Sequence, residues 1–192
     1  MNTITHLHDV GIVVLVGLMG SGKSTVGTKL AQRLHCSFID IDAQISNDQK
    51  LSVSEIFAQS GEAGFRKIEA SVLAHVLNES CAKIVRHEAQ SVVVATGGGA
   101  VLSVTNRDII INAATHVIWL DADVETLVTR TSLSRNVRPL LETDPRSTLT
   151  ALRNDRSDFY EQIATERIIT SHLGIDQVVD AVLRVIQSSV SK

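Results

Sequence analysis

The sequence predicts an α/β protein in which a five-stranded parallel sheet is flanked by helices. Three observations lead to this fold class. Five short apolar runs alternate with stretches whose apolar residues recur at helical spacing. The runs are apolar almost throughout, as strands are when helices cover both faces of a parallel sheet. A glycine-rich loop, GLMGSGKST at residues 17–25, joins the first run to the first helical stretch.

The predicted elements alternate along a chain of 192 residues. The strands are expected at residues 12–16, 37–39, 92–95, 116–120 and 167–169. The helices are expected at residues 24–34, 53–59, 62–78, 104–111, 124–131, 145–164 and 177–187, with a surface excursion at 81–91. Because crossovers between parallel strands are right-handed, the loops that follow the strands meet at one edge of the sheet, where ligands are expected to bind.

The loop at residues 17–25 contains the spacing G-x-x-x-x-G-K-[ST]. Its glycines let backbone N–H groups converge on an anion, and the start of the next helix adds a positive dipole end. Lys23 is expected to neutralise the outer phosphates of a nucleotide, and Ser24 to bind Mg²⁺. The predicted nucleotide-binding residues of this loop are Gly20, Ser21, Gly22, Lys23, Ser24 and Thr25.

Two aspartates follow the second predicted strand, in the sequence FIDID. Asp40 and Asp42 are separated by one residue, so on an extended backbone both side chains lie on one face. One carboxylate is expected to join the metal shell, and the other to accept a hydrogen bond from a substrate hydroxyl and help its deprotonation. The alternative is that Asp42 caps a helix and Asp40 is merely exposed.

Two further segments carry candidate ligand-binding groups. Arg66, in GEAGFRKIE at residues 61–69, lies within a helical pattern, where an isolated arginine is usually a solvated charge. Gly97, Gly98 and Gly99, in ATGGGAV, directly follow a buried strand. Three consecutive glycines cost backbone entropy, so they indicate the close approach of a ligand or of another backbone segment.

Three more arginines complete a cationic set. Arg130 and Arg138 lie beside or within residues 132–144, which have little apolar periodicity and are predicted to form a lid. Pro139 stiffens the chain just after Arg138, which suits a basic side chain that a closing loop delivers. Arg156 belongs to the helical stretch that follows the lid.

Composition and charge limit the classes of function. The formal net charge of -3 gives no general attraction to nucleic acid or anionic lipid. The longest early apolar run, residues 12–16, is too short to span a bilayer, and residues 1–10 lack the basic start and apolar body of a secretion signal. We therefore expect a cytoplasmic enzyme of one domain, with no nucleic-acid or membrane partner.

Six segments, taken in order, resemble those of the shikimate kinase family. They are GLMGSGKST, FIDID, GEAGFRKIE, ATGGGAV, NVRPLL and RSDFY. The resemblance runs from about Gly11 to Ile169. It implies a three-layer P-loop kinase fold over residues 1–192, with a substrate-binding segment at about 40–80. It also implies an enzyme that phosphorylates the 3-hydroxyl of shikimate with MgATP, in aromatic amino-acid biosynthesis, and we expect this enzyme to be a monomer.

The resemblance implies roles for the residues that would hold shikimate. Asp42 would bind the shikimate hydroxyls, and Asp40 would lie near the metal and the reacting hydroxyl. Arg66 and Arg156 would pair with the substrate carboxylate, where a planar guanidinium can form two parallel bonds. The backbone of residues 97–99 would face the substrate.

The resemblance also implies roles on the nucleotide side. Arg138 would reach from the lid to the phosphates, and Arg130 would lie by the adenine. The implied catalytic residues are Lys23, Asp40, Asp42 and Arg138, and the implied metal ligands are Ser24 and Asp40.

Two other functions share part of the pattern. A gluconate kinase would share the loop and a hydroxylated acid as substrate, but the FRKIE and triple-glycine segments favour shikimate. A GTP-dependent switch could use residues 117–121, VIWLD, as a metal-binding strand that ends in Asp121. No N-K-x-D guanine motif occurs in the sequence, which argues against the switch.

Overall fold

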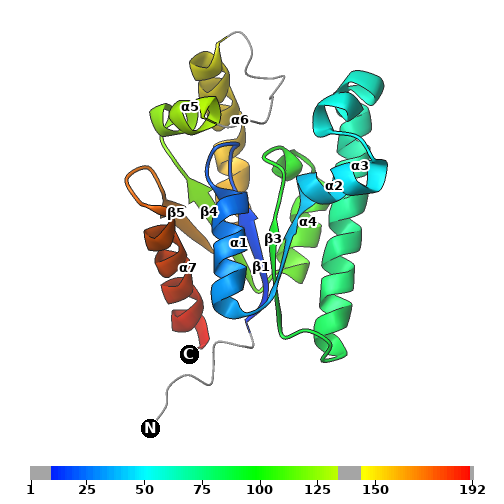
Figure 1. Cartoon of the computed structure of the whole chain (residues 1–192), viewed down its shortest axis with the longest axis vertical. Coiled ribbons are helices and arrows are strands. Elements are labelled where there is room, and N and C mark those ends of the chain that lie inside the picture. Colours follow the sequence, from blue (N-terminus) through cyan, green and yellow to red (C-terminus); the bar gives the residue numbers. More distant parts are fainter. Residues whose placement is uncertain (1–9, 134–143, 191–192) are drawn as a thin grey trace.

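The computed structural model describes residues 10–133 and 144–190, which form a parallel sheet with helices on both faces (Figure 1). The strands are β1 (Gly11–Val16), β2 (Ser37–Asp40), β3 (Ser91–Ala95), β4 (His116–Asp121) and β5 (Glu166–Ile169). The helices are α1 (Lys23–Leu34), α2 (Ile41–Gln49), α3 (Val53–Val85), η1 (Ala100–Leu102, a 3₁₀ helix), α4 (Val104–Ala113), α5 (Val124–Ser132), α6 (Pro145–Ile163) and α7 (Ile175–Val190). The predicted five-stranded parallel sheet is confirmed.

The sheet has the strand order β2-β3-β1-β4-β5, and all neighbouring strands are parallel. β1 lies at the centre, where Leu15 is in register with Ala95 of β3 and with Ile118 of β4. Because the strands are parallel, their carboxyl ends lie at the same edge. The loops after β1, β2 and β3, the three adjacent strands, therefore begin side by side.

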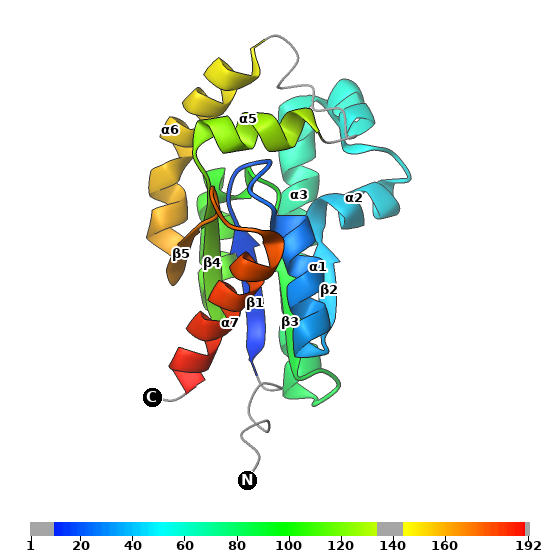
Figure 2. The same ribbon diagram turned by 60° about the vertical axis from the view of Figure 1, so that its left-hand side comes forward.

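Alternate residues of β1 face different helices. Val13 and Leu15 pack with α1 and α7, whereas Ile12, Val14 and Val16 pack with α3, α4 and α6. Figure 2 shows α1 and α7 together on one face of the sheet. Helices thus cover both faces, which explains why the strands are apolar on both sides.

A helix replaces the extended backbone that the sequence predicts at Asp40 and Asp42. β2 ends at Asp40 and α2 begins at Ile41, so Asp40 and Asp42 do not share one face of a strand. Asp40 is the N-cap of α2, since its Oδ1 accepts from the N–H groups of Asp42 and Ala43 at 3.0 and 3.2 Å. The extended arrangement and the alternative in which Asp42 is the cap are both wrong, because aspartate at the end of β2 satisfies the helix N–H groups itself.

The helices expected at residues 53–59 and 62–78 are the two parts of α3, which Gly61 interrupts with φ 65° and ψ 179°. A capping box of Ser52 and Glu55 fixes its start. The second part continues to Val85, although a surface excursion was expected at residues 81–91. It does so because Cys81 and Ile84 extend the apolar face of the helix and pack against the core.

The predicted lid at residues 132–144 falls largely outside the described residues, and Arg138 falls there with it. After this segment, Asp144 caps α6 by accepting from the N–H of Ser147 at 3.1 Å. None of the helices in the two described ranges is both long and apolar enough to cross a bilayer.

Candidate active site

The loop between β1 and α1 places its glycines in conformations that other residues rarely adopt. Gly17, Gly20 and Gly22 have φ values of 141°, 82° and 99°. α1 begins at Lys23 after Gly22, which provides no side-chain cap, so the N–H groups that start the helix lie at this loop. The Nζ of Lys23 donates to the carbonyls of Gly17 and Leu18 at 2.8 and 2.9 Å. A positive amine and the N–H groups at the start of a helix thus adjoin one loop, as phosphate binding requires.

A hydroxyl and a carboxylate meet beside this loop. The hydroxyl of Ser24, in the first turn of α1, donates to Oδ2 of Asp40 at 2.5 Å. The other oxygen of Asp40 caps α2, so the carboxylate is held from two sides. These oxygens are of the kind that Mg²⁺ prefers, and Mg²⁺ in phosphoryl-transfer sites is held by one or two protein oxygens, water and phosphate. The pair fits the predicted metal site.

In the described part of the chain, His, Cys, Asp and Glu form no group of three or more that could hold a metal ion. A site built from Ser24, Asp40 and nucleotide phosphates does not need such a group. In the same loop, the hydroxyl of Ser21 is buried and has no hydrogen-bond partner among the described residues. A phosphate oxygen would supply the missing acceptor.

Gly97 lies against two carboxylates from different helices. A Cβ added to Gly97 would come within 2.8 Å of Oδ1 of Asp42 and would overlap Oε1 of Glu69. Glu69, on α3, is 0% exposed, and its Oε1 lacks a hydrogen-bond partner among the described residues. Burial raises the pKa of Glu69, and the neighbouring guanidinium of Arg66 opposes this rise. Asp42 and Glu69 therefore present acceptors on one side of the glycine triplet.

Arg66 lies flat against the end of the glycine triplet. A Cβ on Gly99 would overlap Cζ and both terminal nitrogens of the Arg66 guanidinium. Nη1 of Arg66 donates to Glu69 at 2.7 Å, and Nη2 donates to Glu62 at 3.2 Å. The Arg66 side chain is 24% exposed, so it is not the freely solvated charge that an isolated helical arginine usually is. Glycine is needed at 99 because any side chain would displace the guanidinium.

The carbonyl of Gly98 accepts two hydrogen bonds from α6. Nη1 of Arg156 donates to it at 3.0 Å and the hydroxyl of Tyr160 at 2.6 Å. Both side chains are buried, and burial raises the pKa of the Tyr160 phenol, which therefore stays a donor. The Tyr160 ring stacks on Trp119 of β4 with centroids 5.6 Å apart. Packing against the sheet thus places Arg156 at the glycine triplet.

The glycine triplet and the phosphate loop are in direct contact. A Cβ on Gly98 would lie 3.3 Å from the backbone nitrogen of Met19 and 3.4 Å from the carbonyl oxygen of Gly17. The cluster of Asp42, Arg66 and Arg156 around residues 97–99 therefore adjoins the phosphate loop. Acidic and basic side chains and the backbone of the glycine triplet therefore lie beside an anion-binding loop.

Arg130, on α5, is fixed to the loop that follows β5. Its two terminal nitrogens donate to Oγ1 and to the backbone carbonyl of Thr170, at 3.0 and 2.7 Å. Ser171 accepts from the N–H of Asp123, and hydrogen bonds, chiefly from the N–H of Thr126, lower the pKa of Asp123 to about 2. The start of α5 and the loop after β5 are thus joined at the same edge of the sheet as the phosphate loop.

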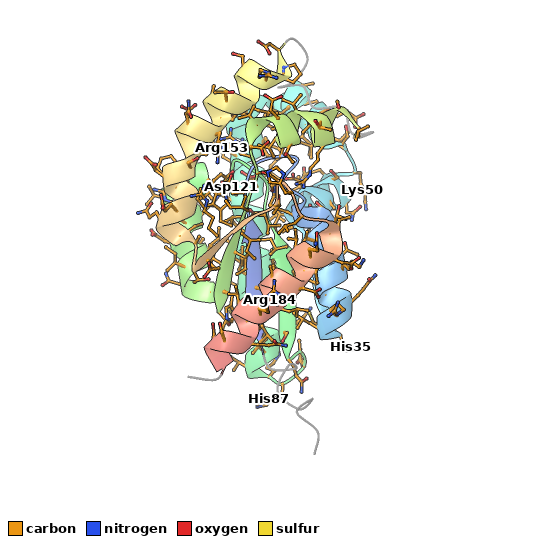
Figure 3. All side chains as sticks on the ribbon, turned by 90° about the vertical axis from the view of Figure 1, so that its left-hand side faces the viewer. His35, Lys50, His87, Asp121, Arg153 and Arg184 are labelled. Carbon is orange, nitrogen blue, oxygen red and sulfur yellow. The ribbon has the colours of Figure 1, made fainter. Side chains whose placement is uncertain are left out.

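Asp121 ends β4 in an ion pair rather than facing a metal. Its Oδ2 accepts from Arg153 of α6 at 2.8 Å and from Arg167 of β5 at 2.6 Å, and the Arg167 guanidinium lies 4.3 Å from the Trp119 ring centroid. Figure 3 shows Asp121 and Arg153 near one another in the upper half of the view, well above His35. Both arginines pair with the Asp121 carboxylate. This pairing argues against a GTP-dependent switch in which Asp121 would bind a metal.

A cavity of about 470 Å³ opens beside the Arg66 guanidinium. It lies between α3 and the η1–α4 segment. Its lining residues are Glu62, Ala63, Arg66, Gly99, Leu102, Ser103 and Asn106. Arg107, next to it on α4, donates to the carbonyl of Val101 at 2.6 Å, and Asn106 donates to the carbonyl of Ala100 at 3.0 Å. These two residues hold η1, and with it the end of the glycine triplet, in place.

The structure brings most of the predicted site residues to one edge of the sheet. The phosphate loop, Asp40, Asp42, Arg66, residues 97–99 and Arg156 lie together, Arg130 lies at the loop after β5, and Arg138 is outside the described residues. The sequence did not predict roles in the site for Glu62, Glu69, Tyr160 and Thr170. The spacing of Glu62 and Glu69, four residues before and three after Arg66, is the signal that could have indicated partners for that arginine.

Comparisons with known proteins agree on one family. The family model for shikimate kinase matches residues 19–187. A curated shikimate kinase from Symbiobacterium thermophilum is 42% identical over 91% of this chain and 95% of its own length. A structure described as shikimate kinase from Acinetobacter baumannii in complex with shikimate has a TM-score of 0.83 at 32% identity, covering 93% of this chain and 94% of its own. A gluconokinase from Sinorhizobium meliloti, at 17% identity and a TM-score of 0.60 over 94% of both chains, shares the fold alone.

Proposed function

The chain belongs to the shikimate kinase family, and from this membership we propose how its residues divide the reaction. It is an enzyme that transfers a phosphoryl group from ATP to the 3-hydroxyl of shikimate, a step in aromatic amino-acid biosynthesis. One contact supports the assignment of residues above all: Gly98 packs directly on the phosphate loop at Gly17 and Met19. Groups that suit a hydroxylated acid therefore lie next to groups that suit a triphosphate.

The phosphate loop binds ATP in this proposal. The N–H groups of residues 20–25 and the amine of Lys23 surround the β and γ phosphates, and the amine leaves the carbonyls of Gly17 and Leu18 to do so. Ser24 and Asp40 hold Mg²⁺, which when bound neutralises negative charge on the phosphate oxygens. Arg130 supports the adenine from the position that Thr170 gives it. Arg138 approaches the phosphates from the segment outside the described residues.

The glycine triplet holds the acid. Arg66 and Arg156 bind the shikimate carboxylate, because they are two guanidinium groups that reach residues 97–99 from two different helices, α3 and α6. Asp42, in contact with Gly97, accepts hydrogen bonds from the ring hydroxyls and receives the proton as the 3-hydroxyl attacks. Because residues 97–99 are glycines, the shikimate ring can lie directly against their backbone. We further propose that the enzyme acts as a monomer in the cytoplasm.

A coupled assay of ADP formation tests this assignment of substrate. MgATP is supplied with shikimate, with gluconate and with a nucleoside monophosphate in separate reactions. Turnover with shikimate and background rates with the other two are expected. Turnover with gluconate alone would show that the glycine triplet and its arginines hold an open-chain acid, and turnover with a nucleoside monophosphate alone would contradict the proposal.

Asp40→Asn is expected to raise the Mg²⁺ concentration needed for half-maximal activity and to lower kcat, by about tenfold each. Asparagine caps a helix as well as aspartate does, so α2 keeps its start while the charge beside Ser24 is lost. Activity is measured as a function of free Mg²⁺ at saturating ATP and shikimate. The matched control is Asp123→Asn, which makes the same change at the N-cap of α5. An unchanged Mg²⁺ dependence in Asp40→Asn would contradict its role at the metal.

Gly99→Ala is expected to lower kcat/KM for shikimate by about 10²-fold, with little change in the KM for ATP. The backbone at Gly99, with φ -101° and ψ -3°, allows alanine, so the effect comes from the overlap of Cβ with the Arg66 guanidinium. Steady-state kinetics with each substrate varied measures the two effects separately. Gly174→Ala is the control, because its Cβ would find only the Gln177 side chain, 3.6 Å away. Equal effects on both substrates would count against the assignment.

A further inference from the structure

Arg66 has a carboxylate on each side, and the two carboxylates differ in their freedom to move. Glu69 contacts Nη1 at 2.7 Å and its side chain is 0% exposed. Glu62 contacts Nη2 at 3.2 Å and its side chain is 59% exposed. Glu69 is therefore fixed in the protein interior, whereas Glu62 can turn into water without losing buried contacts.

Only one of these carboxylates lines the cavity beside Arg66. Glu62, Arg66 and Gly99 all contribute to its wall, and Glu69 does not. Gly99 packs so closely against the guanidinium that there is no room even for a Cβ between them. A ligand that enters the cavity and approaches Arg66 therefore meets the carboxylate of Glu62, which contacts Nη2, and not that of Glu69.

The charges around Arg66 explain why its contact with Glu62 affects the binding of a ligand. One guanidinium already faces two carboxylates, and Nε is buried with no hydrogen-bond partner among the described residues. A third carboxylate would add repulsion unless one of the first two left. Glu69 cannot leave, because its burial would then be uncompensated. Glu62, at the exposed end of the ion pair, is the group that a ligand can displace.

We propose that Glu62 occupies the position of the substrate carboxylate on Arg66 and must be displaced when shikimate binds. Glu62 thus sets the affinity for the acid by competing for one nitrogen of the guanidinium. It is not a catalytic residue, because it leaves the site before the reaction. This inference rests on the proposed function, in which Arg66 binds the carboxylate of shikimate.

Glu62→Gln tests the competition because it keeps the size and a hydrogen-bond acceptor while it removes the charge. The dissociation constants of shikimate and of its neutral methyl ester are measured by calorimetry for the wild type and the variant. Glu62→Gln is expected to bind shikimate about two- to fivefold more tightly, equivalent to roughly 0.4–1 kcal/mol, the range of exposed ion pairs. Binding of the ester, which has no charge to compete, is expected to be unchanged.

Glu79→Gln is the matched control, since it makes the same change at an exposed position of the same helix. It is expected to leave both dissociation constants unchanged. Weaker binding of shikimate by Glu62→Gln would overturn the inference, because it would mean that Glu62 holds Arg66 ready for the substrate. Equal changes for acid and ester would also overturn it.

The same measurements separate this inference from the function on which it rests. If the wild type binds the acid more tightly than the ester, and Glu62→Gln leaves that preference as it was, only the competition is wrong. If the wild type shows no preference for the acid, the role of Arg66 under the proposed function fails, and the competition fails with it.

Discussion

Replacing Lys23 with methionine is expected to lower kcat by about 10²- to 10³-fold. Phosphoryl transfer is catalysed by positioning and by charge stabilisation, and Lys23 is the positive group that the phosphate loop itself supplies. Methionine has a similar length and no charge, so it fills the same space over Gly17 and Leu18. The rate of ADP formation at saturating ATP and shikimate measures the loss.

A second lysine on the same helix serves as control for Lys23→Met. Lys29 pairs with Asp176 of α7 at the surface, and its side chain is 41% exposed. Lys29→Met removes the same charge from α1 and is expected to leave kcat unchanged. A thermal unfolding curve of each variant shows whether the fold is kept. A Lys23→Met protein that folds and retains most of its kcat would remove the phosphate loop from the catalytic mechanism.

Arg66→Ala is expected to raise the KM for shikimate by about 30-fold to several thousandfold while changing the KM for ATP little. Truncation of one partner of a desolvated charge pair costs roughly 2–5 kcal/mol of binding, and 1.4 kcal/mol is a factor of ten. The variant loses the guanidinium that lies against Gly99, while the phosphate loop is untouched. Steady-state kinetics with each substrate varied at saturating concentrations of the other gives both constants.

Loss of Arg66 also leaves Glu69 buried without its cation, so the fold needs a separate check. The double variant Arg66→Ala/Glu69→Gln removes that unpaired charge. Its KM for shikimate is expected to stay high while its stability recovers. Arg146→Ala is the exposed control, since Arg146 pairs with Glu125 at the surface. Equal rises in the two KM values for Arg66→Ala would contradict its assignment to the acid.

The phosphate loop and the sheet could be predicted because their determinants are local. Glycines at fixed spacing before Lys23 specify the loop, and apolar runs such as residues 12–16 specify buried strands. The strand order could not be derived in this way, because it depends on which strands pair across the whole chain. The sequence nevertheless identified the edge of the sheet where the loops meet.

The partners of the site residues were harder to predict. Asp40 and Asp42 do not share one face of a strand because α2 begins at Ile41, and the fully buried residues of that short helix are Ile41 and Ile45. Such a helix leaves a weak apolar pattern in the sequence. The contact of Arg130 with Thr170 joins segments 40 residues apart, and no local pattern specifies it. Residues could be assigned to the site, but their hydrogen bonds depend on tertiary packing.

The central place of β1 in the sheet has a consequence for folding during synthesis on the ribosome. Within residues 10–133 and 144–190, β1 pairs only with β3 and β4, and β2 only with β3, so the first two strands have no sheet partner until residues 91–95 are made. Residues 17–90 must be synthesised in between, which takes roughly 4 to 15 seconds at about 5–20 residues per second. For that time the apolar β1 segment has no sheet to pack into, so the sheet forms only after about half of the chain has been made.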